Sequence, residues 1–149
     1  MTTAREIMSS KVVTIESSVS AAEIAKIMDK NKVSSIIITK DQLPIGIITE
    51  RDLVSKIVAQ NKKPSEVKTM DITTSPLIVT SPLTPIDEVA EKMVAKKIRR
   101  VVVMDSNQPL GIITVTDFVK HLNTMLEDSE NYKKELYEKL IEDWEHWMS

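Results

Sequence analysis

The sequence predicts an α/β fold of the α+β kind, built from two copies of a β-α-β-β-α unit and followed by a C-terminal amphipathic helix. The chain has only two glycines, Gly46 and Gly111, and they hold the same place in the stretches P-I-G-I-I-T-E-R-D and P-L-G-I-I-T-V-T-D. Residues keep matching at the same offset of 65 without a gap from Glu23 to Val54. Apolar residues alternate between short continuous runs, typical of strands, and helical spacing. These observations indicate a tandem duplication.

The first repeat is expected to contain a helical lead-in, three strands and two helices. Ser20 and Glu23 form a predicted capping box that opens a helix ending near Asn31. Two apolar strands follow, joined by a polar turn of hairpin length, and Thr49 then begins the last helix. The expected ranges are 4–8 for the lead-in, 12–15, 35–39 and 44–48 for the strands, and 20–31 and 49 onward for the helices, the last with Leu53, Ile57 and Val58 facing inward.

The second repeat is expected to follow the same order. Thr84 and Pro85 mark its first helix, because proline is favoured in a first helical turn, and Thr114 begins its last helix. The expected inward positions are Val89, Met93, Val94, Phe118, Val119 and Leu122. The strands are expected at 77–80, 100–104 and 110–113, and the chain divides into repeat 1 (4–60), a polar linker (61–69), repeat 2 (70–126) and a tail (127–149).

Composition excludes several classes of protein. The net charge of −2 gives no overall attraction for nucleic acid, and the absence of cysteine excludes disulfides and thiolate chemistry. No apolar run approaches the roughly 20 residues that span a bilayer, and the N-terminus lacks the apolar region of a signal peptide. We therefore expect a cytoplasmic protein.

The tail carries apolar residues at helical spacing, separated by charges. They are Tyr132, Leu136, Leu140, Trp144 and Trp147. Such a helix packs either on its own domain or on a partner. Because tryptophan is enriched in interfaces and neither repeat needs this segment to complete itself, the sequence favours docking on a second copy of the chain or on another protein.

The two T-x-x-D motifs, Thr49 to Asp52 and Thr114 to Asp117, have a structural and a functional interpretation. As a capping pattern, each places threonine at the N-cap and aspartate in the first turn of a helix. The functional interpretation rests on the duplication, because both motifs follow a strand at the position where ligands bind in open sheets. An ionised aspartate can accept hydrogen bonds from two neighbouring ribose hydroxyls, and the preceding glycine lets backbone approach a ligand closely.

The β-α-β-β-α unit that ends in G-I-I-T-x-x-D, present twice, resembles the CBS domain family, and the pair resembles a Bateman module over about residues 4 to 126. The resemblance implies two pseudo-symmetric repeats packed sheet to sheet, with two clefts that bind AMP, ADP, ATP or S-adenosylmethionine. By position, Asp52 and Asp117 would hold the ribose and Thr49 and Thr114 would lie near ribose and phosphate. Backbone bordering the base would come from Val12, Val13, Leu77 and Ile78.

Three arginines distinguish the repeats. Arg51 lies inside the first motif, where the second has Thr116, whereas Arg99 and Arg100 open the middle strand of the second repeat. Each is either a solvated charge or a group that neutralises phosphate. The asymmetry predicts two unequal sites.

The favoured function is a stand-alone regulatory module that senses a ligand, with no required cofactor, and an enzyme is not expected. His121 and His146 have no second ligand at metal spacing, and no glycine-rich phosphate loop exists. One alternative is an interaction module with vestigial clefts that acts through the tail. Another alternative is nucleic-acid binding through a basic cluster, which is formed by Lys92, Lys96, Lys97, Arg99 and Arg100. A solvated helix face explains this cluster more simply. We expect a homodimer to which the tail contributes, and an output through another protein.

Overall fold

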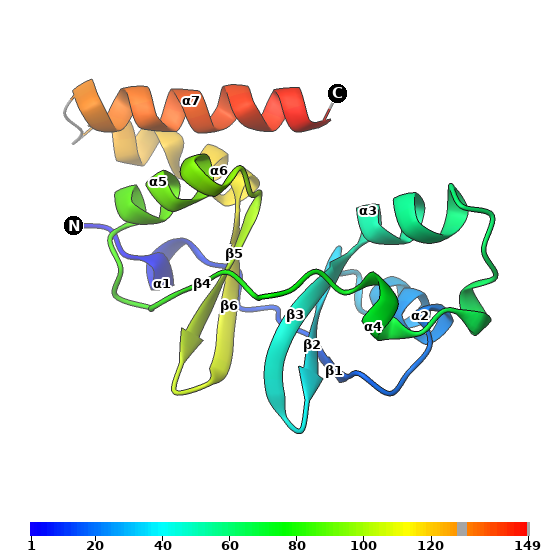
Figure 1. The fold of residues 1–149 in the computed structure, drawn as a ribbon. Coiled ribbons are helices and arrows are strands. Elements are labelled where there is room, and N and C mark those ends of the chain that lie inside the picture. The colour runs from blue at the N-terminus through cyan, green and yellow to red at the C-terminus, as the bar shows by residue number, and fades with distance from the viewer. Residues whose placement is uncertain (128–130, 149) are drawn as a thin grey trace. The chain divides into compact units, whose positions relative to one another are not determined.

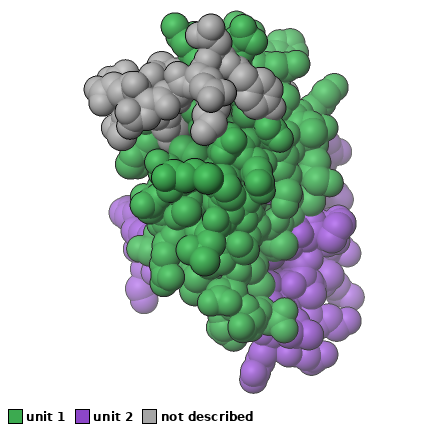
Figure 2. Space-filling model, turned by 90° about the vertical axis from the view of Figure 1, so that its left-hand side faces the viewer, with its two compact units in different colours: residues 1–10, 78–149 green, residues 11–77 purple. Residues whose placement is uncertain are grey.

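The computed structural model describes the backbone of residues 1–127 and 131–148 and the side chains of residues 1–122 and 134–146. The chain forms two compact units. Unit 1 comprises residues 1–10 and 78–149, and unit 2 comprises residues 11–77 (Figure 2). Each unit contains one three-stranded sheet and its own apolar core.

Unit 2 contains the strands of the first repeat. β1 (Thr14–Glu16) pairs in parallel with β2 (Ser35–Lys40), and β2 pairs antiparallel with β3 (Leu43–Thr49) (Figure 1). The helical segments of unit 2 are α2 (Ala21–Asn31), α3 (Glu50–Leu53), the π-helix η1 (Val54–Val58), the 3₁₀-helix η2 (Pro64–Glu66) and α4 (Thr69–Ile72). Its core gathers isoleucines from the sheet around Ile24 and Met28 of α2.

Unit 1 repeats this arrangement with the second half of the chain. β4 (Val79–Thr80) pairs in parallel with β5 (Arg100–Asp105), which pairs antiparallel with β6 (Gln108–Thr114). The helices of unit 1 are α1 (Ala4–Ile7), α5 (Ile86–Lys96), α6 (Val115–Glu127) and α7 (Asn131–Met148). The α/β class and the duplicated β-α-β-β-α order are thereby confirmed. The first strand of each unit begins two residues later than expected, so Val12, Val13, Leu77 and Ile78 precede the strands.

Both hairpins turn over two residues with positive φ. Asp41 and Gln42 have φ of 52° and 67°, and Ser106 and Asn107 have φ of 49° and 65°. Two consecutive positive values are the signature of a type I′ turn, whose twist matches that of the strands it joins. The polar turn predicted from the sequence is therefore confirmed, although neither turn uses glycine.

The first long helix begins with only half of the predicted capping box. The Ser20 side chain accepts a hydrogen bond from the Glu23 N–H (3.3 Å), as expected. The Glu23 carboxylate instead lies 3.9 Å from the Lys26 ammonium, one turn along the exposed face. At the other end, Lys32 takes a left-handed φ of 55° as C-cap, and its counterpart Lys97 does the same in α5 with φ of 53°.

The predicted inner face of the last helix in each repeat needs correction. Ile57 is buried and Leu53 packs on the core of unit 2, but Val58 is 71% exposed. The chain follows a π-helix from Val54 to Val58, and its wider turn rotates Val58 away from the core. In unit 1, Phe118 is buried and Leu122 packs on the core, whereas Val119 is 43% exposed.

The compact units differ from the sequence repeats because the lead-in helices are exchanged. α1 precedes the first repeat, yet its Ala4 and Ile7 are buried in the core of unit 1 with the second repeat. α4 precedes the second repeat, yet Thr69 and Ile72 are buried in unit 2, where Ile72 joins the core. The stretch expected to be a polar linker, 61–69, accordingly contains η2 and places Val67 against the core of unit 2.

The tail helix α7 packs on its own unit. Tyr137 and Leu140 are buried in the core of unit 1, and the Tyr137 ring lies 5.9 Å from the Phe118 ring of α6. Figure 1 shows α7 lying along α5 and α6. The expectation that this helix docks on a partner is therefore wrong for its described side chains, and the simpler interpretation holds. Tyr132 and Trp147 lie outside the described side chains.

Candidate functional site

The first T-x-x-D motif forms the corner between β3 and α3. The Thr49 N–H and the Thr49 hydroxyl both donate to Asp52 Oδ2, at 2.8 and 3.1 Å. In return, the Asp52 N–H donates to Thr49 Oγ1 at 3.3 Å. This reciprocal capping box begins the helix and fixes the orientation of the carboxylate. The second oxygen, Oδ1, takes no part in the cap.

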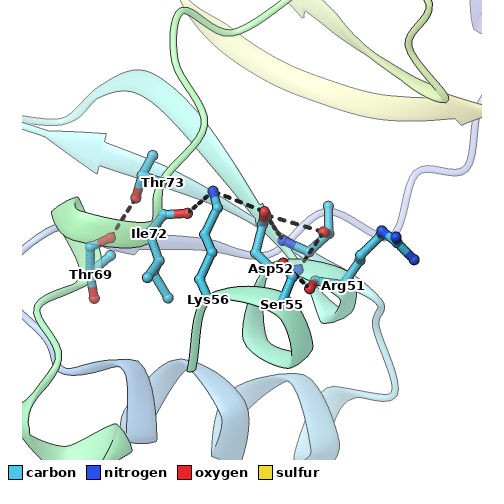
Figure 3. A network of polar contacts seen from close by, with 8 residues as sticks. Arg51, Asp52, Ser55, Lys56, Thr69, Ile72 and Thr73 are labelled. Atoms are coloured by element: carbon cyan, nitrogen blue, oxygen red, sulfur yellow. Dashed lines mark hydrogen bonds and ion pairs between the residues drawn. The ribbon is translucent and has the colours of Figure 1, made fainter. Parts of the chain in front are cut away.

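Lys56 occupies the second oxygen of Asp52. Its ammonium lies 3.1 Å from Asp52 Oδ1 and also donates to the carbonyl of Ile72, at the end of α4, at 3.1 Å. Figure 3 shows the Lys56 side chain extending between these two acceptors. The side chain of Asp52 is only 14% exposed and that of Lys56 is 40% exposed, so water screens this ion pair only in part.

The second motif forms the equivalent corner between β6 and α6. The Thr114 N–H and hydroxyl donate to Asp117 Oδ2 at 2.8 and 3.2 Å, which repeats the geometry of the first corner. The residue equivalent to Lys56 is His121, which is exposed. Among the residues that the structure describes, no hydrogen bond or ion pair engages Asp117 Oδ1. The two corners therefore share the cap and differ at the outer carboxylate oxygen.

The strand register brings the other predicted residues of the first repeat to the same end of its sheet. Thr49 lies opposite Ser35, the first residue of β2. The Ile37 N–H donates to the Val13 carbonyl (2.9 Å), so Val12 and Val13 approach this end just before β1. Val13 itself packs against the core of unit 2.

Unit 1 repeats this placement. Thr114 lies opposite Arg100, and the Val115 N–H donates to the Arg99 carbonyl (3.3 Å). The Val102 N–H donates to the Ile78 carbonyl (3.0 Å), which places Ile78 immediately before β4. Leu77, the residue before it, is the last residue of unit 2.

The three predicted arginines differ in exposure. Arg51 is exposed, and in Figure 3 its side chain extends away from Lys56. Arg99 and Arg100 are half-buried, and each makes a polar interaction within the protein. Their backbone adjoins the second corner, as the register requires.

The role expected for the glycines needs correction. A Cβ atom added at Gly46 would lie 2.5 Å from the Thr74 carbonyl oxygen, and one added at Gly111 would lie 2.7 Å from the Ser9 carbonyl oxygen. The approaching backbone belongs to segments bridged to the two strands, Thr74 with Ile47 and Ser9 with Ile112. Glycine is needed because the chain's own backbone lies against it at both positions.

The sequence interpretation missed Lys56. Its place four residues after Asp52 puts both side chains on one face of a helix, and this spacing could have revealed the pair. The neighbouring contact with Ile72 could not have been anticipated, because it depends on where α4 packs.

The described residues do not bring together a metal site or a continuous basic surface. In the described residues, no group of three or more His, Cys, Asp or Glu side chains could hold a metal ion. The ammonium of Lys92 donates to the Val79 carbonyl (2.8 Å), and Lys97 forms the C-cap of α5. The basic cluster is thus spread over a helix, its cap and the start of β5. No helix in the described part of the chain is both long and apolar enough to cross a membrane.

Comparisons with known proteins agree with this architecture. The model of the CBS domain family matches residues 4–59 and 69–124. The uncharacterized protein MK0525 of Methanopyrus kandleri is 38% identical over 138 residues, which are 88% of this chain and 70% of that protein. The L-aspartate semialdehyde sulfurtransferase of Methanocaldococcus jannaschii is 34% identical over 119 residues, 78% of this chain but only 22% of that enzyme.

Two solved structures are also similar. The CBS domain pair of protein MJ0100, in complex with 5′-methylthioadenosine and S-adenosyl-L-methionine, is 32% identical with a TM-score of 0.72, over 83% of this chain and 98% of that one. The hexameric CBS-CP12 protein from bloom-forming cyanobacteria is 30% identical with a TM-score of 0.79, over 89% of this chain and 78% of that one. With both halves matched, this chain belongs to the CBS domain family and contains a tandem CBS pair.

Proposed function

We propose that the chain is a regulatory module that binds an adenosine-containing ligand through the carboxylates of Asp52 and Asp117. AMP, ADP, ATP and S-adenosylmethionine are the candidate ligands. The module senses the ligand and acts on a partner protein, without chemistry of its own.

The observation that carries the proposal is the duplicated orientation of the two carboxylates. In each corner Oδ2 accepts two hydrogen bonds from the motif threonine, so the carboxylate is fixed before any ligand arrives. A carboxylate held in this way and left with an outer oxygen is suited to accept hydrogen bonds from a ribose diol. Each such charge-assisted bond contributes roughly 1.5–3 kcal/mol.

The relatives support the adenosine class. The similar CBS pair of protein MJ0100 was solved with 5′-methylthioadenosine and S-adenosyl-L-methionine. Both ligands share the adenosine group with AMP and ATP, which differ from them in charge. The ribose diol, which all four ligands share, is the part that we assign to the two aspartates.

The remaining predicted residues receive roles in the same proposal. Backbone near the start of the first strand in each repeat borders the base, and Thr49 and Thr114 lie beside the ribose and phosphate. Arginines neutralise phosphate where the ligand carries it. The base-bordering residues are Val12, Val13, Leu77 and Ile78, and the phosphate-binding residues are Arg51, Arg99 and Arg100.

Calorimetric titration tests the proposal. We expect saturable heat with at least one of 5′-methylthioadenosine, S-adenosylmethionine, AMP and ATP. Asp52→Asn and Asp117→Asn should each weaken binding at their own corner by about tenfold or more, since each removes the charge from the hydrogen bonds to the diol. Asparagine is preferable to alanine, because its carbonyl oxygen can still accept the capping hydrogen bond.

A matched control is Asp29→Asn, whose carboxylate is exposed and lies 3.9 Å from Lys32 on the surface of α2. This variant should bind as the wild type does. Binding that survives both Asp52→Asn and Asp117→Asn unchanged, or a wild type without saturable heat for any of the four ligands, would contradict the proposed function.

A further inference from the structure

The two corners offer different numbers of free acceptor positions. An ionised carboxylate has about four lone-pair positions, two on each oxygen. In both corners the threonine N–H and hydroxyl use the two positions of Oδ2. The outer oxygen, Oδ1, must therefore supply whatever a ligand receives.

Lys56 takes one of the two outer positions of Asp52. Its ammonium lies 3.1 Å from Oδ1. A second acceptor, the Ile72 carbonyl at 3.1 Å, holds the ammonium in place, so the lysine is anchored from two sides. One position remains at Asp52, whereas both outer positions of Asp117 have no partner among the described residues.

A ribose diol donates two hydrogen bonds. Asp117 can accept both, and Asp52 can accept both only if Lys56 leaves. We infer that Lys56 is a specificity-determining residue that competes with the ribose for Asp52, so that the Asp117 corner binds the diol more tightly. This inference rests on the proposed function, and it identifies which of the two corners fills first.

The duplication supplies a natural exchange of residues for the test. Lys56 and His121 occupy equivalent positions, so Lys56→His gives the first corner the residue of the second, and His121→Lys does the reverse. Lys56→Met removes the charge while keeping a stem of similar length. Lys26→Met is the matched control, because Lys26 is 76% exposed and lies 3.9 Å from Glu23 on α2.

Each corner is measured alone by calorimetry with 5′-methylthioadenosine, which carries the diol and no phosphate. Asp117→Asn leaves the first corner intact, and Asp52→Asn leaves the second. We expect the first corner alone to bind about tenfold more weakly than the second, the difference of roughly one charge-assisted hydrogen bond.

The exchange variants are then added to these backgrounds. Adding Lys56→His or Lys56→Met to Asp117→Asn should raise the affinity by about tenfold, and adding Lys26→Met should leave it unchanged. Adding His121→Lys to Asp52→Asn should weaken binding by about tenfold.

The 2′-deoxy analogue of 5′-methylthioadenosine tests how many acceptor positions on Oδ1 are open at each corner. Loss of the 2′-hydroxyl should weaken binding by about tenfold at the Asp117 corner, where two positions are open. At the Asp52 corner the loss should be about threefold or less while Lys56 is present, and about tenfold in the Lys56→Met variant.

The outcomes separate the two proposals. If both corners bind the probe and neither Lys56→His nor Lys56→Met strengthens the first, the competition by Lys56 is overturned while the proposed function stands. If no variant gives saturable heat although circular dichroism shows each to be folded, both are overturned.

Discussion

The two oxygens of each motif aspartate have different surroundings. Oδ2 caps a helix, and Oδ1 is left for a partner. In the first corner that partner is Lys56, at 3.1 Å. The structural and functional interpretations of the motif are therefore compatible, because capping one oxygen is what orients the other. A loss of stability in an aspartate variant must accordingly be separated from a loss of binding.

The glycines lead to a stability prediction at the scale of the residue. Gly46→Ala and Gly111→Ala should each lower the free energy of unfolding by about 1–3 kcal/mol, the usual cost of overpacking. The new methyl group meets a backbone carbonyl at both positions. Gly46→Ala should cost more, since its other nearest atoms belong to Thr73 and Thr74, whereas Gly111 faces the flexible Met8 side chain. Urea denaturation measures both, and a neutral Gly46→Ala would contradict the close approach.

The burial of Tyr137 predicts that the free energy of unfolding depends on pH in the alkaline range. Burial, assisted by the negative charge of Asp87, raises the pKa of Tyr137 from 10.0 to about 12. The folded state then keeps its proton between these values while the unfolded state loses it. The contribution to stability is complete below pH 10 and falls by about 1.4 kcal/mol per pH unit up to about pH 12.

Tyr137→Phe should remove this part of the alkaline destabilisation. Urea denaturation of both proteins at pH 9, 10.5 and 11.5 measures the difference. We expect the wild type to lose more stability than the variant over this range. Parallel loss in both proteins would show that Tyr137 titrates alike in the folded and unfolded states.

At the scale of the element, the short lead-in helices and the tail helix are determined by packing. α1 and α4 have four residues each, which is too few for a helix that is stable alone. α1 buries one face in unit 1, with the second repeat, and α4 buries one face in unit 2, with the first repeat. α7 is amphipathic, and its buried residues complete the core of unit 1. In each of these helices, the described residues that face away from the core of the unit are the exposed ones.

The position of α7 predicts a large effect for Leu140→Ala. Leu140 is fully buried in the core of unit 1, so the substitution should cost about 2–5 kcal/mol of unfolding free energy. Glu138→Ala, on the exposed side of the same helix, is the control and should change stability by less than about 0.5 kcal/mol. Thermal and urea unfolding measure both. An equal, small effect would place α7 away from the core.

At the scale of the whole molecule, the chain forms two units, each of which combines the sheet of one repeat with the lead-in helix of the other. Residues 1–10 join residues 78–149, and residues 61–77 stay with the first repeat. Because each unit recruits the lead-in of the other repeat, neither sequence repeat contains all of one core. Removing residues 1–10 should therefore destabilise the second repeat in particular, through the loss of Ala4 and Ile7.

The expected homodimer remains a prediction at this scale. Val54 and Val58 are 59% and 71% exposed, one helical turn apart, and such apolar surface favours association. Sedimentation equilibrium should show a dimer for the wild type and a smaller species for Val58→Glu. Leu83→Glu, at another exposed apolar residue, is the control. A wild-type monomer would contradict the prediction.

Local pattern was sufficient for much of the structure. The hairpin turns and the threonine caps depend on residues two to five positions apart, and the duplication and the order of elements follow from comparing the two halves of the sequence at their offset of 65. Asp52 and Asp117 lie three residues after their threonines, and Lys56 lies four residues after Asp52, so these contacts are also local in sequence. This is why the two corners could be located from the motifs Thr49 to Asp52 and Thr114 to Asp117.

Tertiary structure alone decided the rest. Which repeat receives a lead-in helix, which backbone lies against each glycine, and where α7 packs all depend on contacts between residues far apart in the chain. The Ile72 carbonyl that holds Lys56 is of the same kind. An apolar stripe shows that a surface must be covered, but only the packed chain selects which of several available surfaces covers it.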